Sequence, residues 1–77
     1  NFSVRMIMEK RAYKVPDMHC PNCKMRLEGL EDELPGIRQI YASYHQQTLN
    51  VEFDERLVSE AEIIQTAKSM GYQLLAD

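Results

Sequence analysis

Residues 37–54 read IRQIYASYHQQTLNVEFD, and the alternation in this stretch indicates two strands joined by a short turn. In the second half, Leu49, Val51 and Phe53 alternate with polar residues, which is typical of a strand with one buried face. The apolar positions of the first half are Ile37, Ile40, Ala42 and Tyr44. A polar turn, His45-Gln46-Gln47, separates the two halves, so the stretch predicts a β-hairpin.

A helix is expected on each side of the hairpin. Upstream, apolar residues recur with the spacing of one helix face at Cys23, Leu27, Leu30 and Leu34. Pro21 suits the first helical position, and Pro35-Gly36 ends the helix. Downstream, Ser59 and Glu62 form a capping-box pattern at the start of a second helix. The buried face of that helix is expected to hold Ile63, Ile64, Ala67 and Met70.

Two further strands complete the pattern. Tyr13 and Val15 alternate with their neighbours ahead of Pro16, which predicts a strand before the first helix. Residues 72–75 supply a short strand after the second helix. In the resulting order β-α-β-β-α-β, right-handed crossovers place both helices on one face of a four-stranded antiparallel sheet. The sequence therefore predicts an α+β fold, a ferredoxin-like sandwich.

Composition excludes several classes of protein. The chain has 77 residues, and its 9 Lys and Arg against 12 Asp and Glu give a net charge of −3, without the basic run of a nucleic-acid binder. Hydrophobic residues make up 44% of the chain, which fits a folded domain. No stretch approaches the roughly 20 apolar residues of a membrane helix. One domain is expected at residues 11–77, and residues 1–10 are assigned to an N-terminal extension or an expression remnant.

The two cysteines, Cys20 and Cys23, form a single Cys-x-x-Cys pair at the predicted start of the first helix. Two cysteines this close cannot provide the disulfide framework of a small secreted domain. Helix N-termini lower cysteine pKa values, and thiolates are soft metal ligands. The pair therefore suits Cu(I), which accepts two sulfur ligands. The residue types also leave open that both cysteines are ordinary small buried residues.

The chain resembles the heavy-metal-associated domain family. The resemblance rests on the run MHCPNC at residues 18–23, on Pro35-Gly36-Ile37 and on Met70-Gly71-Tyr72, and it covers about residues 11–75. The family includes cytosolic copper chaperones and amino-terminal metal-binding domains of P-type metal ATPases. The resemblance therefore implies a non-enzymatic, cytoplasmic metallochaperone or metal-transport domain. Its two cysteines would bind Cu(I) and pass it by ligand exchange to such an ATPase or its metal-binding domain.

The resemblance also implies roles for the neighbours of the pair. In the family, the methionine that corresponds to Met18 props the metal loop from below, which agrees with packing as the usual role of a methionine beside a core. The family's late aromatic, here Tyr72, lies near the metal loop and can shield the site, with core filling as an equal alternative. Lys24 and Arg26 border the site, where they offset the charge of a Cu(I) bis-thiolate, steer a partner, or simply form a solvated helix face.

Two positions depart from the family pattern and keep zinc open. Asp17 stands where the family commonly has Gly, and His19 stands where Thr or Ser is frequent. Zinc prefers four ligands and accepts imidazole and carboxylate, so these residues could join the two thiolates in a Zn(II) site. His45, in the hairpin turn, is expected at the opposite end of the molecule as a polar loop residue.

Other functions remain as alternatives. Cys-Pro-Asn-Cys is similar to the motif of glutaredoxin-like thiol–disulfide oxidoreductases. Against that reading, the only proline after the pair, Pro35, ends a helix, and a hairpin follows where that family needs a crossover. An interaction module with incidental cysteines is a third class. Ions shared by two copies through four thiolates would give a metal-bridged dimer. The sequence leaves open whether the chain is a free chaperone or a transporter domain.

Overall fold

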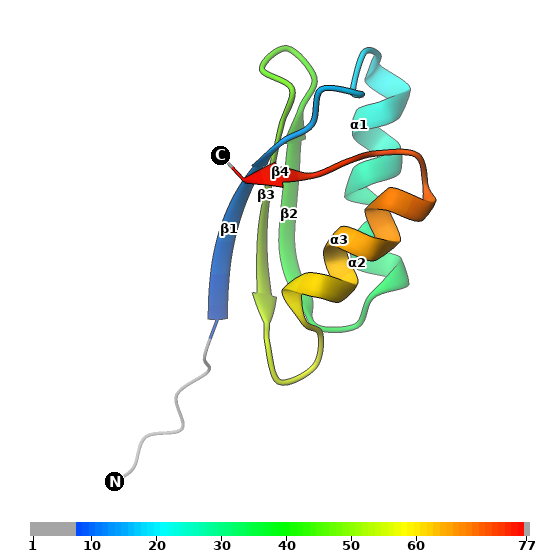
Figure 1. Cartoon of the computed structure of the whole chain (residues 1–77). Helices are drawn as coiled ribbons and strands as arrows, with labels where there is room; N and C mark the ends of the chain where they lie inside the picture. Colours follow the sequence, from blue (N-terminus) through cyan, green and yellow to red (C-terminus); the bar gives the residue numbers. More distant parts are fainter. Residues whose placement is uncertain (1–7, 77) are drawn as a thin grey trace, which may run out of the picture.

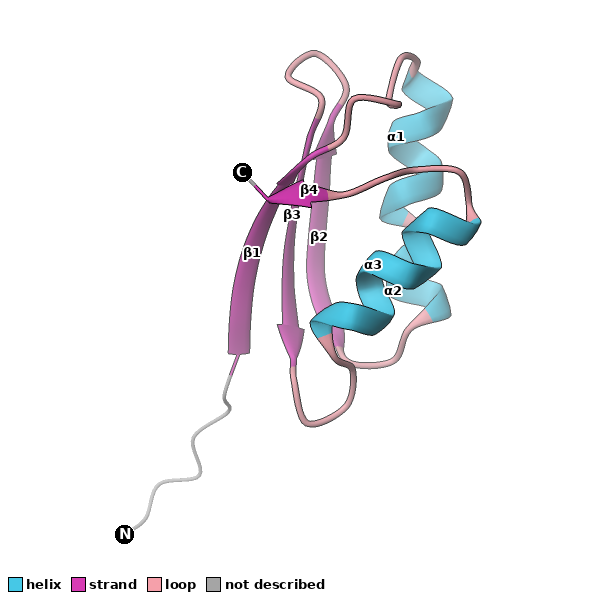
Figure 2. Ribbon diagram, viewed as in Figure 1, coloured by secondary structure: helices cyan, strands magenta, loops and turns pink. Residues whose placement is uncertain are grey.

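The computed structural model describes residues 8–76 as one sheet covered on one face by helices (Figure 1). The strands are β1 (Met8–Lys14), β2 (Ile37–Ser43), β3 (Thr48–Asp54) and β4 (Leu75–Ala76). The helices are α1 (Pro21–Glu28), α2 (Leu30–Glu33) and α3 (Glu60–Ser69). Figure 2 shows all of these helices on the same side of the sheet. The predicted ferredoxin-like sandwich is therefore confirmed.

The strands pair in the order β2-β3-β1-β4, and each neighbouring pair is antiparallel. The ladder between β1 and β3 runs from Met8 opposite Asp54 to Lys14 opposite Thr48. Residues 8–10 of the segment assigned to an extension are thus part of the sheet. The rest of that segment, residues 1–7, lies outside the described residues.

The core fills the space between the sheet and the helices. Leu49, Val51 and Phe53 of β3 are almost completely buried, as their alternation predicted. The helices contribute Leu27, Leu30, Ile63 and Ala67 to the same core. Apolar burial contributes roughly 25 cal/mol per Å² and is the main stabilising term for such a small domain.

The helix boundaries agree with the sequence at α3 and differ at α1. The hydroxyl of Ser59 accepts a hydrogen bond from the Glu62 N–H, and the Glu62 carboxylate accepts one from the Ser59 N–H, so the capping box is confirmed. The single helix predicted upstream is interrupted at Gly29, between α1 and α2, and Leu34 lies beyond α2. Glycine is a poor helix former, a signal that the regular leucine spacing obscured. None of the helices among residues 8–76 has the length and apolar character needed to cross a bilayer.

The last strand is shorter than predicted. The sequence favours a strand over residues 72–75, but β4 comprises only Leu75 and Ala76. The Tyr72 N–H donates to the Ala67 carbonyl at the end of α3, at 2.9 Å. The Gln73 N–H donates to the Asp17 carboxylate at 3.1 Å. Because both N–H groups are bound elsewhere, they cannot join a ladder.

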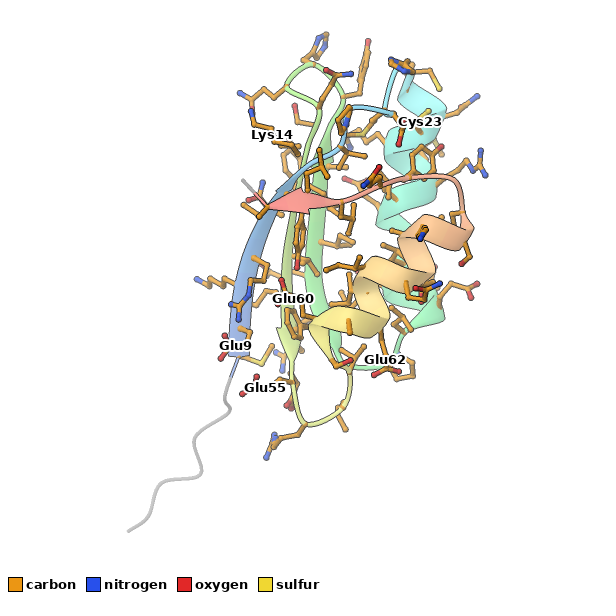
Figure 3. All side chains as sticks on the ribbon, in the orientation of Figure 1. Glu9, Lys14, Cys23, Glu55, Glu60 and Glu62 are labelled. Atoms are coloured by element: carbon orange, nitrogen blue, oxygen red, sulfur yellow. The ribbon has the colours of Figure 1, made fainter. Side chains whose placement is uncertain are left out.

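The β1–α1 loop and the β2–β3 turn lie at the same end of the sandwich (Figure 1). Hydrogen bonds from Gln47, in the turn, to Pro16 and Met18, in the loop, join them. The prediction that His45 lies at the opposite end is therefore wrong, because the chain runs away along α1 and α2 and returns along β2. Figure 3 shows Cys23 at this end of the molecule and Glu55 at the other.

Candidate metal centre

The two cysteines lie where the chain turns from β1 into α1. Cys20 has an extended backbone (φ −147°, ψ 160°) and precedes the helix, and Pro21 is the first helical residue. The Cys20 carbonyl accepts hydrogen bonds from the N–H groups of Cys23 and Lys24, at 3.0 and 3.4 Å. This first turn of α1 brings the two Sγ atoms to 2.8 Å from each other, and both residues are half-buried free thiols. The two sulfurs are close enough to bind one ion.

The surroundings of Cys23 favour its thiolate form. The pKa of Cys23 is lowered to about 6, first because the Cys20 thiol donates a hydrogen bond to it. The Tyr72 hydroxyl and the backbone N–H of His19 lower the pKa further by donating to the same sulfur. Above about pH 6, Cys23 is therefore ionised, which is the form that binds a soft cation. Protons compete with metal at this sulfur only as the pH falls through that value.

These causes predict how the Cys23 pKa responds to mutation. Cys20→Ala removes the strongest donor and should raise the pKa of Cys23 most, while Tyr72→Phe removes a weaker donor and should raise it less. A pH titration of the ultraviolet absorbance of the thiolate measures both shifts. Tyr72→Phe keeps both thiols, which titrate in two coupled steps. Its first step is therefore compared with the first step of the unchanged protein. A first step that does not move would mean that Tyr72 does not stabilise the thiolate.

Met18 lies within the core. Its exposed fraction is 0%, and it packs in the same buried cluster as Val15, Leu27 and Tyr72. The expectation that this methionine supports the loop by packing agrees with its burial.

Two substitutions at Met18 should separate packing from ligation. Met18→Leu roughly conserves volume and should cost less than about 1.5 kcal/mol, with metal binding retained. Met18→Ala leaves a cavity and should cost about 2–5 kcal/mol. Urea denaturation and metal binding, measured on the same preparations, test this. If folded Met18→Leu loses the metal, the methionine sulfur is a ligand and packing is not its only role.

Tyr72 connects the thiol pair to Arg26. The tyrosine is 5% exposed, and its hydrogen bond to Cys23, followed by burial, raises its own pKa. The Arg26 guanidinium lies over the Tyr72 ring, with 5.5 Å from its carbon to the ring centroid, and it reaches the Met70 carbonyl at 3.5 Å. Arg26 therefore lies against Tyr72, the residue whose hydroxyl donates to the Cys23 sulfur.

The ammonium group of Lys24 binds a carboxylate on its own helix and not a residue of the thiol pair. Its Nζ atom binds both carboxylate oxygens of Glu28, at 3.1 and 3.2 Å, and lies 5.4 Å from the centroid of the Tyr41 ring. Glu28 also accepts a hydrogen bond from the Ala42 N–H of β2 at 3.0 Å. The pKa of Glu28 is lowered, because these hydrogen bonds outweigh the opposing effect of its burial. Lys24 thus forms part of a contact between α1 and β2.

The residues considered for a zinc site do not gather around the sulfurs. The Asp17 carboxylate accepts the Gln73 N–H, and the side chain of His19 is exposed. Within residues 8–76, no three or more His, Cys, Asp and Glu side chains are arranged to hold a metal ion. Among the described residues, the thiols of Cys20 and Cys23 are therefore not joined by a third ligand of these types.

The sequence did not point to Gln47. This residue has a positive φ of 55°, and its side-chain amide donates to the carbonyl groups of Pro16 and Met18. Its contact with the β1–α1 loop could have been found from its place in the hairpin turn, because the topology returns this turn to that loop. A hollow of about 590 Å³ along β1, β2 and β3, lined among others by Lys10, Tyr41 and Asn50, contains neither cysteine.

Comparison with known proteins gives a consistent family. The model of the heavy-metal-associated domain matches residues 12–73. The chain is 32% identical over 54 residues to "Copper-transporting ATPase 2" of Rattus norvegicus, an alignment that covers 70% of this chain and 4% of that protein. It is 28% identical over 67 residues to a "Zinc-transporting ATPase" of Synechocystis sp., covering 87% of this chain and 9% of that protein. The chain thus spans only a small fraction of these relatives.

Among solved structures, the fold matches the putative copper-ion-binding protein from Bacillus anthracis str. Ames. The TM-score is 0.84 at 26% sequence identity, with 91% of this chain and 99% of that chain covered. The likeness thus extends over nearly the whole of both chains.

Proposed function

This chain belongs to the heavy-metal-associated domain family, and we propose that it is a metal carrier that binds one Cu(I) ion through Cys20 and Cys23. The observation that carries the proposal is the pair of free thiols, 2.8 Å apart, at the start of α1. One of these thiols has a pKa near 6, so a thiolate is present at neutral pH without a metal to displace its proton. Two soft sulfur ligands match a soft ion of low coordination number.

Copper fits the pair better than zinc. Zinc prefers four ligands, and the side chains that could add to the pair, those of Asp17 and His19, are respectively bound to Gln73 and exposed. Zn(II) is the second candidate, because one of the relatives is named a zinc-transporting ATPase. A zinc site would require the loop to rearrange and recruit at least one of those residues.

A two-ligand site allows the ion to be handed over. A thiolate from the partner adds to the bound ion and gives a three-coordinate bridge. One cysteine of this chain then leaves, and the second partner thiolate replaces the other. A closed four-ligand cage would instead retain the ion. The low coordination number is therefore part of the proposed mechanism, and no catalysis is involved.

The proposed partner is a P-type metal ATPase or its metal-binding domain. Proteins of this kind contain the segments to which this chain is similar. The same similarity is compatible with a domain of such an ATPase, in which case the partner is a separate carrier. The thiols must be reduced, so a reducing compartment such as the cytoplasm is proposed. Two copies could also share ions through four thiolates and form a dimer.

Transfer can be tested directly. The Cu(I)-loaded chain is mixed under reducing conditions with a metal-free metal-binding domain of a P-type ATPase, the two are separated, and copper is measured in each. Copper that reaches the acceptor faster than it is released into buffer without the acceptor supports ligand exchange. Equal rates contradict it. Catalytic turnover with a small disulfide substrate would instead favour a thiol–disulfide oxidoreductase.

A further inference from the structure

Gln47, in the β2–β3 turn, is bound to the β1–α1 loop through both its side chain and its backbone. This loop, residues 15–20, is called the metal loop below. Its side-chain amide donates hydrogen bonds of 3.1 Å to the carbonyl oxygens of Pro16 and Met18. Its own carbonyl accepts the Val15 N–H at 2.8 Å. A single residue outside the loop therefore satisfies backbone groups at three positions between the end of β1 and Cys20.

Gln47 holds a backbone conformation that its residue type disfavours. Its φ is 55°, and among residues 8–76 no other non-glycine residue has a positive φ. Gly or Asn would suit such a turn position with less strain. Strain of this kind persists where the surrounding structure holds the residue in place. At Gln47 the loop holds the residue in this conformation. The hydrogen bonds to the carbonyl groups of Pro16 and Met18 require a long side chain with an amide, directed toward the loop.

We propose that Gln47 is a positioning residue that orders the metal loop, so that Cys20 is presented at the start of α1 before metal arrives. The base of the loop is also held by the Met18 N–H, which donates to the Val15 carbonyl at 3.0 Å, and by Asp17. Without the Gln47 amide, two loop carbonyls lose their partner, and more of the loop must be ordered when metal binds. Ordering at that stage weakens binding.

The part of this proposal that concerns Cu(I) affinity rests on the proposed function. For its test, the chain offers a matched control at the adjacent position, Gln46. Gln47→Glu keeps the size of the side chain, removes the amide donor and sets a carboxylate beside two carbonyl oxygens. Gln46→Glu adds the same charge to the same turn, where the Gln46 side chain is exposed and forms no hydrogen bond in the described part of the chain.

Competition for Cu(I) with a chromophoric chelator is the first measurement. Gln47→Glu should bind Cu(I) about tenfold more weakly, as expected for two lost hydrogen bonds. Gln46→Glu should stay within about twofold of the unchanged protein. Equal affinities for the two variants would overturn the proposal.

A second variant separates positioning from a purely structural role. Gln47→Gly relieves the positive φ and also removes the amide, so its melting temperature should stay the same or rise while its Cu(I) affinity falls about tenfold. A purely structural role would make affinity follow stability. A Gln47→Gly protein that is at least as stable as the unchanged chain and binds Cu(I) equally well would contradict the proposal.

Hydrogen exchange of the Met18 amide in the metal-free protein tests the ordering without any metal. Exchange should be about tenfold faster in Gln47→Gly and Gln47→Glu than in Gln46→Glu. Unchanged exchange would overturn the role of Gln47, and so would faster exchange with unchanged Cu(I) affinity. If none of these proteins, the unchanged one included, binds Cu(I), the proposed function fails, while the exchange rates still decide whether Gln47 orders the loop.

Discussion

Replacing either Cys20 or Cys23 by Ser is expected to weaken Cu(I) binding by at least about a hundredfold. A serine hydroxyl stays protonated at neutral pH and is a poor ligand for a soft ion, so each variant retains a single thiolate. The size of the loss is taken from structural zinc sites. There the binding free energy of about 10–16 kcal/mol is shared by four ligands, which gives roughly 3 kcal/mol for each ligand. Equilibrium dialysis of the reduced protein against buffered Cu(I) measures the loss.

Met25→Leu is the matched control for these cysteine variants. Met25 lies on α1, close in sequence to the pair, and is 68% exposed. The substitution removes a soft sulfur from the same helix without changing either thiol, so binding should be unchanged. Circular dichroism establishes that all three variants are folded. If both serine variants still retain one ion per chain as tightly as the control does, the two thiols are not the ligands.

Gly36→Ala is expected to destabilise the fold by about 3 kcal/mol. Gly36 has a φ of 112°, which costs an L-residue roughly 1–2 kcal/mol. A Cβ atom there would also lie 2.8 Å from the Cβ of Leu57 and 3.0 Å from a methyl carbon of Val58, and overpacking of this kind adds about 1–3 kcal/mol. Thermal or urea denaturation of the metal-free protein measures the change. Such a loss is a large part of the roughly 4–12 kcal/mol expected for a domain of this size.

Gly71→Ala separates the two contributions. Gly71 has a similar φ of 101°, but a Cβ atom at this position would meet nothing within 4 Å. This variant should therefore lose only the conformational part, about 1 kcal/mol. Equal losses at the two positions would show that contact with Leu57 and Val58 does not exclude a side chain at residue 36.

Much of the fold could be predicted because its signals are local. The alternation of Leu49, Val51 and Phe53, and the capping box of Ser59 with Glu62, depend on residues close together in sequence, and the structure confirms both. The shortened last strand could not be read in this way. It depends on two hydrogen bonds, and one of them joins Gln73 to Asp17, which lie 56 positions apart.

The candidate site shows the same division. The helix start after Cys20 and the pairing of the two sulfurs follow from the spacing of the motif. The partners of Lys24 and Arg26 do not, because two basic residues at positions i and i+2 of one helix face different neighbours. Lys24 binds Glu28 on its own helix, whereas Arg26 reaches across to Tyr72 near the other end of the chain.

The position of His45 could have been predicted from topology alone. Its turn follows a helix that leads away from the metal loop and a strand that leads back, so it had to return to the same end. The contact between Gln47 and the loop is harder to predict, since its side-chain hydrogen bonds span 29 and 31 positions of the sequence.

X-ray absorption at the metal edge of the loaded protein tests most directly whether two sulfur anions hold a copper ion at this helix start. The account predicts Cu(I) with a shell of two short sulfur bonds and no nitrogen or oxygen neighbour. A four-coordinate shell that mixes sulfur with nitrogen or oxygen would contradict it, and would indicate zinc-type ligation with His19 or Asp17 drawn into the site.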